Sequence, residues 1–171
     1  ALAQRALGDG LGAVVDGGVA VDQAPDAGVR LLHVRGAAAQ LGYTCDSPWT
    51  PRVGLAVSYA SGDEDPLDGT HGTADNVFGS KDKYYGRMNL VSWKNLEDYQ
   101  LSFSVRPEQG VRLGVDYHVF RLAAEEDAWY RCNRKPLRRD STGDAGRDLG
   151  HEVDVTLKWK VTGRFETFFG Y

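Results

Sequence analysis

The sequence lacks most of the patterns that mark enzymes, metal proteins and helical membrane proteins. Neither CxxC nor HExxH occurs, and the four histidines, at positions 33, 71, 118 and 151, are scattered. Gly-x-Ser-x-Gly and the phosphate-binding loop are also absent, so we predict that the protein is not an enzyme. No run of about 18 apolar residues occurs, which excludes a membrane-spanning helix.

Cysteine and net charge are scarce as well. Cys45 and Cys132 lie far apart in the chain without metal or redox spacing, so free or buried thiols are the simplest interpretation. A net charge of −4 is mild and argues against nucleic acid as a partner. The chain does not begin with Met or with a charged-then-apolar leader, so we expect a mature, trimmed or partial chain.

The sequence is rich in glycine and aromatic residues. It has 21 glycines and 11% aromatics, whereas helix-forming residues are sparse in its second half. This balance is typical of all-β chains with many turns. A length of 171 residues suits one domain, so we treat residues 1–171 as a single β region.

The clearest pattern is a long β-hairpin at residues 99–122. Apolar and polar residues alternate with a period of two in both halves, and Pro107–Gly110 between them suits a tight turn. One face is purely apolar, whereas the other has Arg, Asp and His at the strand centres. Such strands either cross a bilayer or belong to a soluble β-sandwich. The apolar face consists of Leu101, Phe103, Val105, Val111, Leu113, Val115, Tyr117 and Val119.

Other segments show the same alternation and complete an antiparallel series. We predict an up-and-down transmembrane β-barrel, here a partial barrel of about seven or eight strands, since about eight is the smallest number that closes comfortably. The further strands are expected at 29–43, 52–60, 84–93, 151–161 and 165–171, with a weak one at 18–22 inside an otherwise irregular 1–28.

Two long connections, 61–83 and 123–150, separate these strands. If strand direction alternates, a predicted strand at 84–93 places the two connections on opposite sides of the sheet. The same parity places the turn that holds Cys45 on the side of Cys132. A disulfide between the two cysteines is therefore a candidate, which suits an oxidising compartment.

Several segments resemble one known family, in family order over most of residues 50–171. They are Tyr59–Pro66, Asp68–Gly69, Lys83–Gly86, Asn95–Leu96, Asp116–Ala123, Asp127–Tyr130 and Gly146–Asp154. In these segments the sequence resembles the alginate export family of outer-membrane β-barrels. The resemblance implies a large barrel in the bacterial outer membrane, whose charged pore passes an anionic polyuronate outward, with export partners in the periplasm. This chain would hold the C-terminal portion of such a barrel.

In a barrel, the polar faces of the strands would line the lumen with charge. Several cations that bind weakly would suit passing carboxylate sugars, and interspersed carboxylates would limit the dwell time. The alternative is that these side chains pair with each other and keep the lumen wet. The candidate substrate path comprises Arg87, Arg106, Arg112, Asp116, Asp154, Lys158 and Lys160.

An acidic loop offers a second candidate site. Asp63, Glu64, Asp65 and Asp68 carry oxygen ligands at spacings that Ca²⁺ could use, although a solvated loop is the simpler interpretation. No other cofactor is expected. The sequence thus predicts an outer-membrane channel, in contact with lipid, for an anionic polysaccharide or small solute. Its rival is a soluble β-sandwich that binds glycan or calcium through this loop.

Overall fold

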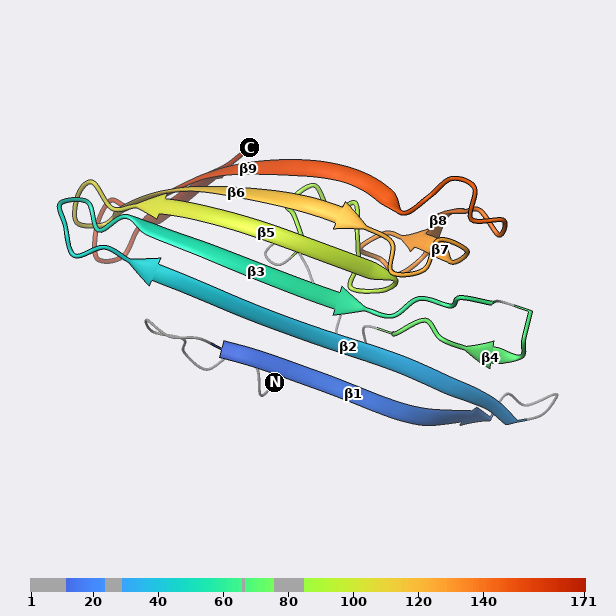
Figure 1. Cartoon of the computed structure of the whole chain (residues 1–171). Helices are drawn as coiled ribbons and strands as arrows, with labels where there is room; N and C mark the ends of the chain where they lie inside the picture. The colour runs from blue at the N-terminus through green and yellow to red at the C-terminus, as the bar shows by residue number, and fades with distance from the viewer. Residues whose placement is uncertain (1–11, 24–28, 66, 76–84) are drawn as a thin grey trace.

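The computed structural model describes residues 12–23, 29–65, 67–75 and 85–171, and in these residues it is all-β (Figure 1). None of them belongs to a helix long and apolar enough to cross a membrane. The strands are β1 (Gly12–Gln23), β2 (Val29–Thr44), β3 (Arg52–Ala60), β4 (Thr70–His71), β5 (Leu96–Val105), β6 (Val111–Arg121), β7 (Ala128–Tyr130), β8 (Pro136–Arg139), β9 (Asp148–Lys160) and β10 (Glu166–Gly170).

Seven strands form one continuous antiparallel sheet in the order β1-β2-β3-β5-β6-β9-β10, so each long strand pairs with the next long strand of the chain. The short β4 adds a parallel pairing to β2. In the tight turn between β5 and β6, Gly110 takes a φ of 88°, which residues with a side chain rarely adopt. The sheet is not closed. The structure therefore confirms the predicted fold class, an all-β, up-and-down partial barrel.

One face of the sheet is apolar and uncovered. Leu55 is 53% exposed, Phe103 47% and Val155 47%, although they lie mid-strand on β3, β5 and β9. Among the described residues the second sheet is only the two-stranded β7–β8 pair, and it does not cover this face. Soluble monomers rarely expose so continuous an apolar surface, so the structure does not fit the soluble β-sandwich.

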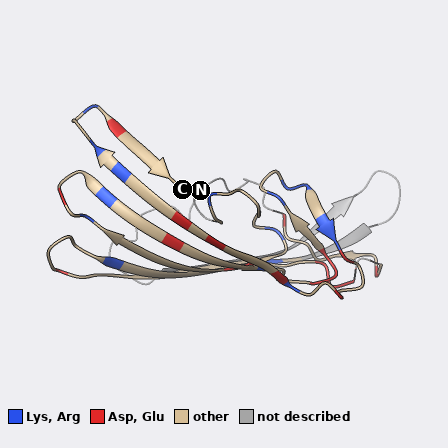
Figure 2. Ribbon diagram, turned by 90° about the horizontal axis from the view of Figure 1, so that it is seen from above, with Lys and Arg blue, Asp and Glu red and all other residues tan. Residues whose placement is uncertain are grey.

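The other face is polar and concave. Figure 2 shows the bowed sheet with the loop connections on its concave side. Residues 85–95, part of the connection between β3 and β5, lie on this face, where Val91, Leu96 and Phe120 form a small buried core. Tyr85, Trp129 and Leu149 pack against that core.

The strand predicted at 84–93 is wrong for the described residues, which begin again at 85. Residues 85–93 have no strand partner; instead the backbone N–H groups of Arg87 and Met88 donate to the carboxylates of Asp154 (3.2 Å) and Glu152 (2.7 Å). Positive φ angles at Gly86 and Asn89 also interrupt an extended backbone. The other predicted strands form, and the weak one at 18–22 is the longer β1.

The loss of that strand changes the parity. Both long connections lie at the same end of the sheet, since the backbone N–H of Asp63 donates to the Asp127 carboxylate (3.1 Å). We call this the loop end. The loops predicted at 61–83 and 123–150 also contain the short strands β4, β7 and β8.

The predicted disulfide is wrong for the same reason. Cys45 lies in the β2–β3 turn at the opposite end, which we call the turn end, and this turn contacts the β5–β6 turn because Arg106 N–H donates to the Trp49 carbonyl (2.7 Å). Cys132 lies in the β7–β8 connection at the loop end. Both cysteines are free.

Candidate functional site on the polar face

The cations of the polar face gather toward the turn end. Arg112 of β6 is in direct register with Lys158 of β9, and Lys158 is in direct register with Phe168 of β10. Lys160 lies one step closer to the turn, opposite Glu166. The structure thus brings three of the predicted cations to one end of the polar face. Arg106 is exposed in the β5–β6 turn at the same end.

Arg87 joins this group from a different element. It is carried by residues 85–95 rather than by a strand, and its guanidinium carbon lies 4.9 Å from the centre of the Phe168 ring. The Lys158 ammonium lies 6.0 Å from the same ring centre, and Arg112 donates to the Ser104 hydroxyl (3.2 Å). Within the described part of the chain, none of these three cations forms a salt bridge with a carboxylate.

The two predicted lumen carboxylates lie closer to the loop end than the strand cations, and Asp154 accepts a hydrogen bond from the Arg87 backbone N–H (3.2 Å). Asp116 is in register with Asp154 on β6 and β9, and the pair Gly114 and Thr156 separates them from the cation row. Asp154 is only 3% exposed, beneath residues 85–95, and Asp116 accepts a hydrogen bond from the Gln100 amide (3.0 Å). The charges are therefore segregated along the strands, not interspersed as the sequence interpretation assumed.

In the next row of the polar face, sequence reasoning placed His118 but did not identify its partners Asp98 and Glu152. His118 is in register with both Gln100 and Glu152, and its Nδ1 is 2.9 Å from the Asp98 carboxylate. Asp98, His118 and Glu152 are all buried. The strand parity of Asp98 and Glu152, the same as that of Asp116, was the signal that could have placed them on this face. The burial of all three residues could not be predicted, because residues 84–93 were assigned to a strand.

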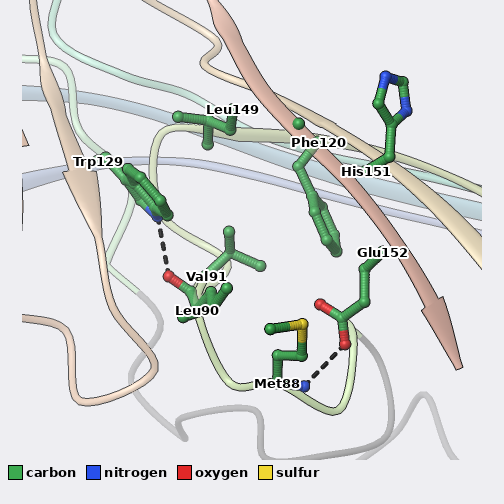
Figure 3. A pocket seen from close by; sticks show the side chains of 9 residues that line it. Met88, Leu90, Val91, Phe120, Trp129, Leu149, His151 and Glu152 are labelled. Atoms are coloured by element: carbon green, nitrogen blue, oxygen red, sulfur yellow. Dashed lines mark hydrogen bonds between the residues drawn. The ribbon is translucent and has the colours of Figure 1, made fainter. Parts of the chain in front are cut away.

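A small cavity lies where these residues meet the buried core. Figure 3 shows Met88, Leu90, Val91, Phe120 and Trp129 around it, with Met88 N–H bonded to Glu152. The Trp129 ring N–H donates to the Leu90 carbonyl (2.8 Å) and helps to hold the segment. The cavity measures about 40 Å³, enough for a water molecule but far too small for a sugar. The solute path is therefore not this cavity.

The buried carboxylate of Asp127 holds the loop end together. Burial alone would raise its pKa, but the hydrogen bonds that it accepts outweigh burial and hold the pKa below the ordinary 3.8. Burial and the Asp127 charge both raise the pKa of Tyr130. The donors are Asp63 N–H (3.1 Å), the Thr73 hydroxyl (2.6 Å), Ala128 N–H (2.6 Å), the Tyr130 hydroxyl (2.9 Å) and the Arg139 guanidinium (2.8 Å).

The candidate calcium ligands do not converge. Asp65 and Asp68 accept hydrogen bonds from the N–H groups of Leu67 (3.0 Å) and Thr70 (2.6 Å), as in ordinary loop turns. Asp63 instead faces His71, at 3.4 Å. Glu64 is exposed. Over the described ranges, no three His, Cys, Asp or Glu side chains group as metal ligands.

Comparison with known proteins identifies the family. The model of the family described as Alginate export matches residues 12–171. No curated protein and no solved structure matches the chain. The matched family comprises outer-membrane β-barrel transport proteins rather than enzymes, which agrees with a sheet that has one apolar and one polar face. The chain therefore belongs to the alginate export family.

Proposed function

We propose that this chain forms part of the wall of an outer-membrane channel that passes an anionic polysaccharide or a similar anionic solute. The observation that carries the proposal is the group of Arg87, Arg112 and Lys158 on the concave face, which forms no salt bridge within the described residues. Cations that pair with each other's carboxylates would only keep the lumen wet. Cations that no described carboxylate pairs with instead attract a mobile anion.

The two faces of the sheet support the same assignment. The apolar face would contact outer-membrane lipid, and the polar face would line the water-filled path. Carboxylates of the solute would bind the cations weakly, as conduction requires, because the cations are partly exposed and well hydrated. Periplasmic export partners stay a prediction, which no contact of the described residues tests.

The test is conductance of the full-length protein in a planar bilayer, with polymannuronate added to one side. Low salt is needed, since about 0.1 M already screens charges beyond about 10 Å. We expect the polymer to block the current. The double variant Arg112→Gln/Lys158→Gln should raise the half-blocking concentration about tenfold, which corresponds to about 1.4 kcal/mol.

Arg121→Gln provides a matched control. Arg121 lies on the same strand as Arg112 and is also exposed, but its parity places it on the apolar side. Its substitution should leave the block unchanged. A protein that never conducts, or a block that both substitutions weaken equally, would refute the proposed path.

A further inference from the structure

We propose that Phe168 is a positioning residue that holds Arg87 and Lys158 together as a carboxylate-binding subsite, which takes one uronate unit of the polymer. This inference rests on the proposed function and names the subsite within it. Its two cations come from two elements, residues 85–95 and β9, while the ring comes from β10. The Phe168 ring contacts both: the Arg87 guanidinium carbon lies 4.9 Å and the Lys158 ammonium 6.0 Å from the ring centre.

The cation row is electrostatically unfavourable as it stands. Arg112 and Lys158 are directly opposite on neighbouring antiparallel strands, where like charges destabilise the pair. A third cation, Arg87, shares the Phe168 ring with Lys158. The negative face of an aromatic ring offsets part of this repulsion without neutralising the charge, as a carboxylate would. The cations therefore stay available to an incoming anion.

Phe168 is a partly exposed aromatic side chain on the edge strand β10. Its register with Lys158 places it on the polar face, yet it is 44% exposed there. The next residue, Phe169, is 59% exposed in register with Leu157, on the face where lipid is expected. Phe169 is thus an ordinary outward aromatic. Phe168, by contrast, presents its ring to cations.

The chemistry of Arg87 and Lys158 fits a carboxylate. A guanidinium offers paired N–H donors that match the two carboxylate oxygens, and an ammonium adds a point charge. Because the Arg87 guanidinium lies over the Phe168 ring, the ring orients the cation. Phe168 therefore acts through Arg87 and Lys158.

The experiment compares two phenylalanine substitutions on one strand. Phe168→Leu in the full-length protein should raise the polymannuronate concentration for half block about two- to fivefold, the factor that a partly exposed cation–π contact provides. Phe169→Leu removes an equal ring from the same strand and should leave the block unchanged. Phe168→Tyr keeps the ring and should restore the wild-type block. The effect of neutral dextran of similar length on the current should be the same in the wild-type protein and in each of these variants.

A double-variant cycle tests whether Phe168 acts through Arg87. Arg87→Gln should give the same two- to fivefold change, and Phe168→Leu should add less than its full effect in that background. Because Arg87 lies outside the strands, Arg87→Gln should leave the sheet intact. It therefore tests the subsite even if the Phe168→Leu protein does not assemble. If Phe168→Leu or Arg87→Gln is blocked at the same polymannuronate concentration as the wild-type protein, the inference about Phe168 is wrong but the proposed function stands. If polymannuronate does not block the wild-type protein, the proposed function itself is wrong.

Discussion

At the scale of single residues, Asp127 determines how the loop end is held. Its carboxylate accepts hydrogen bonds from both long connections, while its side chain is fully buried. A buried charge is tolerated only when its lone pairs are satisfied, which requires all these donors to be in place together. The two connections should therefore open as a unit.

Asp127→Asn should weaken this junction by about 2 kcal/mol, because the amide nitrogen cannot accept the bonds that the second carboxylate oxygen accepts. Hydrogen exchange of the amides in 61–65 and 127–130 should then accelerate about thirtyfold. Asp144→Asn is the control, since Asp144 is an exposed carboxylate of the same loop. Equal exchange in both variants would contradict the assigned role.

The lowered pKa of Asp127 also predicts a pH dependence. A carboxyl whose pKa is lower in the folded state stabilises that state fully well above 3.8 and loses the contribution as pH falls through the folded pKa. Protection of the loop amides, corrected for intrinsic exchange, should therefore stay constant well above pH 3.8 and fall once the pH drops below 3.8. Asp127→Asn should abolish this dependence, and its persistence in the variant would assign it to another group.

At the scale of elements, the alternation of side chains predicted β3, β5, β6 and β9 well because one face of each meets an apolar environment. Residues 85–93 also alternate, yet their polar partners Glu152 and Asp154 lie more than 60 residues away in the sequence. No local pattern reveals such partners. Parity places Arg112, Lys158 and Lys160 on the polar face, but the segregation of cations from carboxylates along β6 and β9 depends on register, which the sequence alone did not supply.

The attachment of residues 85–95 to the sheet can be tested through Gly86. Its φ of +76° disfavours any side chain, and a Cβ there would collide with the Glu152 carboxylate. Gly86→Ala should displace the segment and abolish the protection of the Met88 amide. Gly146→Ala is the matched control, because Gly146 has a similar φ of +70° but no atom within 4 Å of an added Cβ. It should lower the free energy of unfolding only by the backbone penalty of about 1 kcal/mol.

At the scale of the whole molecule, the apolar face decides the environment. Val155→Lys would place a charge near the middle of β9 on this face and should destabilise the protein in lipid vesicles by about 2–4 kcal/mol, measured by urea unfolding. Thr156→Lys, one residue on, faces the polar side and should change little. Equal losses would show that the face does not contact lipid.

The shared position of the two long connections has a mechanical consequence. Each strand of the sheet contacts only its neighbours, so a pulling force would detach strands one after another. The Asp63–Asp127 contact joins the connection before β5 directly to the connection after β6. The hairpin between them is thereby enclosed in a loop tied at its base, and it should leave the sheet only after that tie has broken.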